Sequence, residues 1–307
     1  MGEGTPEGLP IITNGDAKTP FGSIYLTWMG FVFLLRKGRK YMLNSKDYLS
    51  LDGLGTALKT LTIFPWPRRA SEDFGSSLIW FPVIGLLLGI VLYAANLLWG
   101  LLPFTLWPGG GALLLLAMEI YLTRGLHLDG LADWADSIGG FFQREKRLLI
   151  MKDTSLGTFG VLALFVALLA KWLAFERLIS CGSVVWLLII FTLSRGMMAE
   201  LMATLPYARS EDGMGQPFVA RASTRNRVLS LVVSIVFCIP FGPFSLLLFC
   251  LGWLETKLFG IRCRHEFGGI TGDLLGTSNE MVEITLLMIC ALLGESLLPF
   301  TGWGWTF

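Results

Sequence analysis

The stretch of sequence that decides the fold lies at residues 124–160 and reads RGLHLDGLADWADSIGGFFQREKRLLIMKDTSLGTFG. Strongly apolar runs flank it, yet it holds five Asp or Glu, five Lys or Arg, and one of the chain's two histidines. Asp129, Asp133 and Asp136 are separated by four and three residues, so a helix would carry them on one face, within about 60° of each other. Like charges at this spacing repel, and Mg²⁺, which binds carboxylate and phosphate oxygens, would reverse that penalty. The spacing predicts a metal–phosphate site; the alternative is a solvated helix face with Asp129 as its N-cap.

The sequence around this stretch is typical of a membrane protein. Of the 307 residues, 53% are hydrophobic and only 15% are charged, against about 25% charged in a soluble domain. Spanning a bilayer takes about 17–25 apolar residues, and seven runs approach that length: 78–102, 109–126, 158–175, 183–201, 228–240, 243–259 and 281–298. The run at 228–240 is short, so it should begin earlier, tilt, or form a hairpin with the next run. We expect an all-α fold, a polytopic membrane bundle of about seven transmembrane helices.

The first 50 residues differ from the rest of the chain. Residues 21–35 are a short apolar segment followed by the basic run RKGRK, which would suit a short span or an interfacial helix. Met42 could also be a start in its own right. We predict an N-terminal extension at 1–50, partly disordered, and a membrane-embedded catalytic domain at 51–307. That domain opens with an amphipathic interfacial helix over residues 51–67.

The distribution of basic residues predicts the orientation in the membrane. Alternating spans place 20 of the 24 Lys and Arg on one side, in residues 36–69, 124–152, 209–227 and 257–264. Basic loops remain on the cytoplasmic side, so we expect the large polar loops to be cytoplasmic and the C-terminus to lie outside. The formal net charge of +1 gives no reason to expect a nucleic-acid partner.

Residues 152–160, KDTSLGTFG, lead directly into an apolar run. Free backbone N–H groups at the start of a helix attract anions, and Lys152, Asp153 and Thr158 stand at this start. We expect the segment to bind substrate phosphate. The alternative is an ordinary helix start that is capped by Asp153 or Ser155.

Two later loops add candidate ligand contacts. Arg209 lies in a loop punctuated by Pro and Gly, where it would bind phosphate or be an ordinary solvated charge. In the predicted loop 262–283, Gly269 and Gly272 would let the backbone approach a ligand closely. Asp273 lies between glycines in that loop without a capping role, so we expect it to act in catalysis.

Several further charged residues border or enter the apolar runs. Thr277 and Glu280 have the spacing of a capping box, which favours a structural role for Glu280. Arg195 lies inside a predicted span, where a charge marks a pathway or a buried pair unless the side chain reaches the interface. Glu283 enters the last span and would need a partner or a metal.

The set of functional groups narrows the chemistry. The sequence contains no Ser-His-Asp or Cys-His set and no GxxxxGK[ST] motif, so a Walker-type ATPase is not indicated. Clustered carboxylates with basic and glycine-rich neighbours suit Mg²⁺-assisted phosphoryl or nucleotidyl transfer, in which the metal neutralises charge on a diphosphate.

The same motifs resemble a known family, the cobalamin synthases, which are adenosylcobinamide-GDP ribazoletransferases. The resemblance rests on GLHLDGLADWADSIGG (125–140), MKDTSLGTFG (151–160), PYAR with its following Gly-x-Gly (206–215), GGITGDLLG with a later Glu (268–280), and TIFPWP (62–67). The motifs occur in the family's order, and the similarity covers about residues 51–300. Residues 1–41 have no counterpart in it.

The resemblance implies a membrane transferase that uses Mg²⁺. Such an enzyme joins adenosylcobinamide-GDP to α-ribazole or its 5′-phosphate, releases GMP, and is located in the bacterial cytoplasmic (inner) membrane. Analogy with the Asp-rich helix of CDP-alcohol phosphotransferases assigns Asp129, Asp133 and Asp136 to Mg²⁺ and to catalysis, with any one of them able to act as general base. Asp273 would complete the metal shell or orient the incoming hydroxyl. The expected substrate-binding residues are His127, Lys152, Asp153, Thr158, Arg209, Gly269 and Gly272.

Two alternatives remain open on the sequence. A CDP-alcohol-type lipid transferase would need DGxxARx₈GxxxD spacing, which the residues after Asp129 do not fit. A transporter would concentrate its charges in the middle of the spans, whereas nearly all the charges here lie in predicted loops. The oligomeric state, including a homo-oligomer, is not determined by the sequence.

Overall fold

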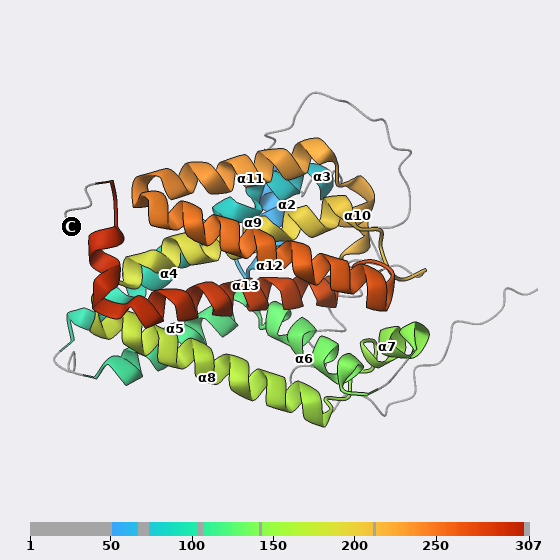
Figure 1. Cartoon of the computed structure of the whole chain (residues 1–307), viewed down its shortest axis with the longest axis horizontal. Helices are drawn as coiled ribbons and strands as arrows, with labels where there is room; N and C mark the ends of the chain where they lie inside the picture. The colour runs from blue at the N-terminus through green and yellow to red at the C-terminus, as the bar shows by residue number, and fades with distance from the viewer. Residues whose placement is uncertain (1–50, 67–73, 103–106, 141–142, 211–212, 304–307) are drawn as a thin grey trace, which may run out of the picture. The chain divides into compact units, whose positions relative to one another are not determined.

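The computed structural model describes residues 51–66, 74–102, 107–140, 143–210 and 213–303, which are drawn in colour in Figure 1. All of them belong to one compact unit, Asp47–Phe307. The predictions for residues 1–50, the apolar segment 21–35 among them, lie outside the described residues.

The described residues are almost entirely helical. The helices are α2 (Leu51–Leu61), α3 (Phe74–Ser77), α4 (Phe81–Gly100), α5 (Pro108–Thr123), α6 (Leu126–Ile138), α7 (Arg144–Ile150), α8 (Thr158–Ser180), α9 (Leu187–Thr204), α10 (Gln216–Arg221), α11 (Thr224–Cys238), α12 (Pro243–Phe267) and α13 (Gly272–Leu293). Short 3-10 turns are η1 (Leu78–Trp80), η2 (Val184–Trp186), η3 (Ile239–Phe241) and η4 (Gly294–Phe300). Within this part of the chain, one isolated bridge between Tyr207 and Ile270 is the sole β pairing.

Six helical segments are long and apolar enough to cross a membrane, and a seventh span results if α5 and α6 are taken as one helix bent by 88°. This confirms the prediction of an all-α polytopic bundle. The observed helices differ from the predicted apolar runs at ends that carry charged residues. α11 begins earlier than its apolar run, and α12 and α13 extend until only residues 268–271 separate them. The predicted loop 262–283 is therefore wrong, because an apolar window excludes the charged end turns of a helix.

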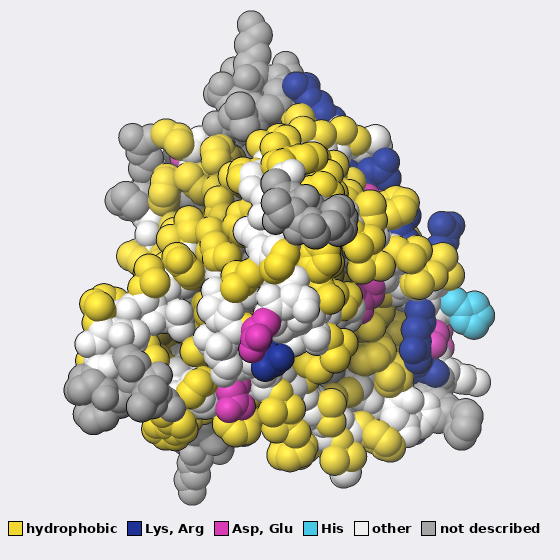
Figure 2. Space-filling view, turned by 60° about the vertical axis from the view of Figure 1, so that its left-hand side comes forward, with side chains coloured by type: hydrophobic (Ala, Val, Ile, Leu, Met, Phe, Trp, Pro, Cys, Tyr) yellow, Lys and Arg dark blue, Asp and Glu magenta, His cyan; other side chains and the backbone are white. Residues whose placement is uncertain are grey.

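The surface of the bundle fits a lipid environment. Along α8, large apolar side chains are exposed in a continuous stripe that includes Phe159, Leu162, Phe165 and Val166. Figure 2 shows one end of the bundle covered mostly by hydrophobic side chains, with Lys and Arg gathered toward one edge of the view. Apolar surface of this extent is typical of a face that contacts lipid.

Helix α9 forms the centre of the bundle, and nearly all of its side chains are buried. It packs most closely against α4, where a Cβ atom at Gly85 would overlap the backbone oxygen of Phe191. A Cβ atom at Gly89 would lie 2.7 Å from the Cα of Leu188. Small residues let membrane helices approach in this way, so the glycines of α4 fix the contact between these two helices.

The chain bends sharply between α5 and α6. Arg124 and Gly125 both adopt left-handed backbone conformations, with φ of 58° and 61°. The Arg124 guanidinium donates hydrogen bonds to the backbone oxygens of Lys59 (2.7 Å) and Thr62 (2.9 Å) at the end of α2. The predicted interfacial helix is thus present as α2, but its apolar face is buried in the bundle.

Candidate active site

The candidate active site is formed where α6 meets the first turn of α13. A Cβ atom at Gly130 of α6 would lie 2.5 Å from the backbone oxygen of Asp273. The Thr277 hydroxyl lies 3.0 Å from the backbone oxygen of Gly130, to which it donates a hydrogen bond. Figure 1 shows α6, α7 and the turn between α12 and α13 at the same end of the bundle. This packing carries the acidic face of α6 to the start of α13, although about 140 residues separate them in the sequence.

Asp273 is the second residue of α13, so its predicted place in a loop is wrong. The helix is capped by Thr271, whose hydroxyl accepts the N–H of Leu274 at 3.2 Å. The Asp273 carboxylate is free for a different contact: Arg209 Nη2 lies 2.7 Å from its Oδ2 atom. Both side chains retain some exposure, 14% for Arg209 and 22% for Asp273. The structure thus joins two of the predicted site residues in a partly exposed ion pair.

The acidic residues outnumber the basic ones at this site. Asp133 experiences repulsion from Asp129, Asp136 and Asp273 and attraction from Arg209. Helix α6 begins at Leu126 with Gly125 as its N-cap, so the alternative that Asp129 caps the helix is wrong. Among the described residues, Arg209 is the one cation that opposes this repulsion at Asp133, so Asp129 and Asp133 have little compensation from the protein, as expected of a site that binds a cation.

The donor set fits Mg²⁺ only in combination with substrate oxygens. In the described part of the chain, one group of three His, Cys, Asp or Glu residues has its ligand atoms within 4.8 Å of one another, and it consists of Glu119, Glu280 and Glu283. The acidic stripe of α6, which is Asp129, Asp133 and Asp136, does not reach that spacing. Mg²⁺ is often held by one or two carboxylates with phosphate and water oxygens completing its shell, and Asp129, Asp133 and Asp273 offer hard oxygen ligands of that kind. Metal binding by Asp129, Asp133 and Asp136 stays a prediction.

Asp136 has a structural contact that the sequence did not indicate. Its Oδ2 atom accepts the backbone N–H of Gly157 at 2.7 Å, and its Oδ1 atom accepts that of Gly160 at 2.8 Å. Because Gly157 is the N-cap of α8 and provides no side chain, the Asp136 carboxylate is the anion at the start of that helix. The predicted capping of α8 by Asp153 or Ser155 is wrong.

The other residues of this segment lie at the surface. Lys152, Asp153 and Thr158 are all exposed beside the start of α8. The backbone N–H of Ser155 donates to Asp153 Oδ1 at 3.0 Å, which lowers the pKa of the Asp153 carboxyl group. Substrate binding by these three residues remains a prediction, but the N–H groups of Gly157 and Gly160 already have a partner.

Two loops with glycine-rich motifs are joined by the isolated bridge. Ala208 N donates to the backbone oxygen of Ile270 at 2.9 Å, and Ile270 N donates to that of Pro206 at 2.9 Å. A Cβ atom at Gly269 would overlap the backbone oxygen of Pro206, so this glycine is required by the contact between the loops. At Gly272 such a Cβ would lie 3.7 Å from the backbone nitrogen of Gly215, an ordinary van der Waals contact, so no close approach between the described residues requires a glycine there.

His127 lies deeper than the acidic stripe. It is 2% exposed, and its Nδ1 atom lies 3.0 Å from the amide nitrogen of Asn279. Its charge environment is set by Lys171 and Arg195, not by the loops. The structure therefore places this predicted substrate-binding residue between the stripe and a buried group of charges.

That buried charge cluster consists of Glu119, Lys171, Arg195, Glu280 and Glu283, which come from α5, α8, α9 and α13. Lys171 Nζ lies 2.5 Å from Glu119, 2.7 Å from Glu280 and 2.6 Å from Glu283. Arg195 pairs with Glu283. Glu280 is thus an ion-pair partner of Lys171 and not the predicted helix cap. Of the alternatives for Arg195, the structure shows the buried pair and not a side chain that reaches the interface. Lys171 occupies the centre of the three carboxylates, where a metal would otherwise bind.

Sequence reasoning missed Lys171 and Glu119. The signal was available, because each is a charged residue inside an apolar run, which is rare in a span without a partner.

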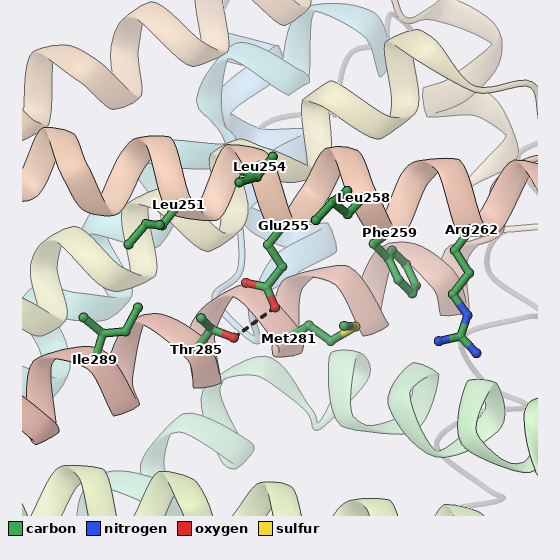
Figure 3. Close-up of a pocket in the computed structure, with 9 residues that line it drawn as sticks. All are labelled: Leu251, Leu254, Glu255, Leu258, Phe259, Arg262, Met281, Thr285 and Ile289. Carbon is green, nitrogen blue, oxygen red and sulfur yellow. Dashed lines mark hydrogen bonds between the residues drawn. The ribbon is translucent and has the colours of Figure 1, made fainter.

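A groove of about 400 Å³ lies between α12 and α13, and Figure 3 shows its lining side chains. Glu255 points across it and accepts a hydrogen bond from the Thr285 hydroxyl at 2.9 Å. The ring of Phe259 and the guanidinium of Arg262 lie 5.9 Å and 5.6 Å from the ring of Trp134. Because Trp134 belongs to α6, these contacts place the end of the groove at Phe259 and Arg262 against the helix that carries the acidic residues.

Comparison with known proteins finds similar sequences over most of the chain. A family model described as cobalamin-5-phosphate synthase matches residues 53–291. A protein of Chlorobium chlorochromatii named adenosylcobinamide-GDP ribazoletransferase is 39% identical over 254 residues, which is 81% of this chain and 100% of that protein. Proteins of the same name from Chlorobaculum parvum (42% identical; 79% of this chain and 96% of that one) and Syntrophobacter fumaroxidans (39%; 77% and 97%) are similarly close. No solved structure matches.

The family match begins after the N-terminal 52 residues and contains every helix from α4 to α12 together with most of α2 and α13. It includes the acidic stripe, both bridged loops and the buried charge cluster. The chain belongs to the cobalamin-5-phosphate synthase family.

Proposed function

We propose that this chain is an adenosylcobinamide-GDP ribazoletransferase. It joins adenosylcobinamide-GDP to α-ribazole, or to α-ribazole 5′-phosphate, and releases GMP. The observation that carries the proposal is the meeting of Asp129, Asp133, Asp273 and Arg209 on segments that all lie within the family match. A carboxylate set next to an arginine suits the transfer of a group from a diphosphate.

The reaction exchanges one phosphorus–oxygen bond for another. The ribose 3′-hydroxyl of ribazole attacks the phosphorus on the cobinamide side, and the bond to the GMP oxygen breaks. The hydroxyl proton passes to a carboxylate of the site, for which Asp133 and Asp129 are the candidates. Arg209, with its Nε atom buried and without a partner, would bind a phosphate oxygen and exchange its pairing with Asp273.

We further propose that the enzyme depends on Mg²⁺. The fit rests on the carboxylates of Asp129, Asp133 and Asp273, whose mutual repulsion the protein offsets only through the pairing of Asp273 with Arg209. When bound, Mg²⁺ would neutralise diphosphate charge and stabilise the leaving phosphate. Asp136 would take part only with lone pairs that its hydrogen bonds to α8 leave free.

The proposed location is the bacterial cytoplasmic membrane, with the site facing the cytoplasm. Support comes from the apolar helices and from the 20 of 24 Lys and Arg that alternating spans place on the side of the acidic stripe. Nucleotide substrates and products are made in the cytoplasm, so this orientation gives them access.

A transporter has one observation in its favour, which is the buried charge cluster in the middle of the spans. Lys171 is, however, paired with three carboxylates, and Arg195 is paired with the second oxygen of one of them, Glu283. Ion pairs that join four helices favour a structural role for the cluster.

The proposal can be tested in cells. A bacterium that lacks its own ribazoletransferase and is supplied with cobinamide should again make cobalamin when this chain is expressed. Failure of a well-inserted protein to restore cobalamin synthesis would count against the proposal.

Replacing Asp273 with Ala should lower kcat by about 100-fold, because the site loses a carboxylate and the partner that orients Arg209. If Asp273 served only to hold the loop that carries Arg209, the free energy of unfolding would fall by about 1 kcal/mol with little change in kcat. Measuring kcat and the melting temperature of the same preparation separates the two roles. An unchanged kcat with a lowered melting temperature would remove Asp273 from catalysis.

Deleting residues 1–41 should leave turnover within about twofold of the full chain, since the family match begins at residue 53. The comparison uses membrane-inserted protein at matched amounts. Loss of more than nine-tenths of the activity would show that this segment contributes to the working enzyme.

A further inference from the structure

We infer that Arg144 and Arg209 form a two-arginine site for the diphosphate, in which Arg144 binds the phosphate that leaves as GMP. The inference rests on the proposed function and assigns a substrate contact to a residue that neither the motifs nor their spacing indicated. Arg144 is the first residue of α7, which follows the acidic helix α6 in the chain.

The first support is the position of the Arg144 guanidinium. Its Nη2 atom lies 3.5 Å from the backbone oxygen of Ala208, the residue before Arg209. It also lies against Gly268, where a Cβ atom would overlap the guanidinium group. Gly268 has a φ of 74°, which suits glycine. Arg144 therefore contacts both of the loops that the bridge at Ile270 joins.

The second support is that most N–H groups of the Arg144 guanidinium have no protein partner in the described part of the chain. One long hydrogen bond to a carbonyl uses a single N–H of the five that a guanidinium offers. In the described part of the chain, no carboxylate pairs with Arg144, whereas Arg147, one turn later, binds Glu266 at 2.9 Å. Arg144 is thus an exposed arginine that is positioned by backbone contacts and has most of its donors available.

The arrangement of the two arginines suggests which phosphate each would bind. Arg209 points toward the carboxylates, since it is paired with Asp273. Arg144 approaches the same loop from α7, next to Gly268, and is exposed. The phosphorus that is attacked must lie near the acids, so the farther phosphate would face Arg144. Planar guanidinium groups bind phosphate through two parallel hydrogen bonds.

The test measures GMP binding to the purified full-length protein in lipid nanodiscs. Arg144→Gln should weaken GMP binding at least tenfold, and Arg144→Lys should fall between that variant and the wild type, since lysine keeps the charge but not the planar fork. The matched control is Arg264→Gln, which removes the same charge from an exposed position in the last turn of α12. It should bind GMP within twofold of the wild type. Melting temperatures confirm that each variant is folded.

Three outcomes would overturn the inference: GMP binding by Arg144→Gln within twofold of the wild type, an equal loss in Arg264→Gln, or no GMP binding by the wild type. In turnover assays, Arg144→Gln should raise KM for adenosylcobinamide-GDP and leave KM for α-ribazole unchanged. If the wild type binds GMP in an Arg144-dependent way but forms no cobalamin, the proposed function fails and the site stands. If it forms cobalamin and Arg144 has no effect, the site fails and the function stands.

Discussion

Asp133→Asn and Asp129→Asn should each reduce GMP release by at least about 100-fold while the protein stays inserted and folded. Asparagine keeps the shape of the side chain but removes the charge that attracts Mg²⁺ and accepts a proton. Changing residues that merely support a metal ligand typically costs 10- to 100-fold, so loss of a ligand should cost at least the upper value. Removing one carboxylate also relieves the repulsion at the site, so the melting temperature should not fall.

The measurement is GMP release at saturating substrate over a range of Mg²⁺ concentrations. Asp52→Asn is the control, because it removes an Asp from the first turn of α2, outside the site, and should retain full activity. Near-normal turnover of either stripe variant at saturating Mg²⁺ would exclude that residue from the metal site.

Lys171→Met should cause the largest loss of stability in this chain. Lys171 is fully buried and lies within 2.7 Å of three carboxylates, and removing one partner of a buried ion pair costs about 3–5 kcal/mol. At about 2–4 °C per kcal/mol for a large domain, the melting temperature in detergent should fall by about 6–20 °C.

A charge-balanced variant separates loss of pairing from loss of packing. Combining Lys171→Met with Glu119→Gln and Glu280→Gln leaves Glu283 paired with Arg195 and removes the uncompensated negative charge. We expect this triple variant to recover at least half of the lost melting temperature. A single Lys171→Met variant that melts within 2 °C of the wild type would show that the buried charge cluster does not stabilise the bundle.

The helices could be predicted well from the sequence because each long apolar run has one explanation in a membrane. Their ends could not. The charged turns at the end of α12 and the start of α13 resemble a loop in composition, and only the packed structure shows that residues 268–271 suffice to connect them. The burial of α2 was hidden for a related reason, since an amphipathic pattern does not say whether lipid or protein covers the apolar face.

The part of the site that could be predicted is the part that helical spacing alone defines, which is the acidic face of α6. Four- and three-residue intervals place Asp129, Asp133 and Asp136 on one face, but spacing does not reveal partners from other helices. Asp136 accepts two N–H groups of α8, and Glu280 faces Lys171 across the bundle. Arg144 was overlooked because an arginine at the start of a short polar helix has no distinguishing pattern. Its position depends on Gly268, more than 100 residues later.

The most direct test of the account supplies the purified wild-type protein, in nanodiscs, with adenosylcobinamide-GDP, α-ribazole and Mg²⁺, and measures both products. We expect GMP and adenosylcobalamin in equal amounts, formed only when the acceptor is present, lost on chelation of Mg²⁺, and reduced at least about 100-fold in Asp133→Asn. GMP formation that does not depend on α-ribazole, or equal product yields from the wild type and Asp133→Asn, would contradict it.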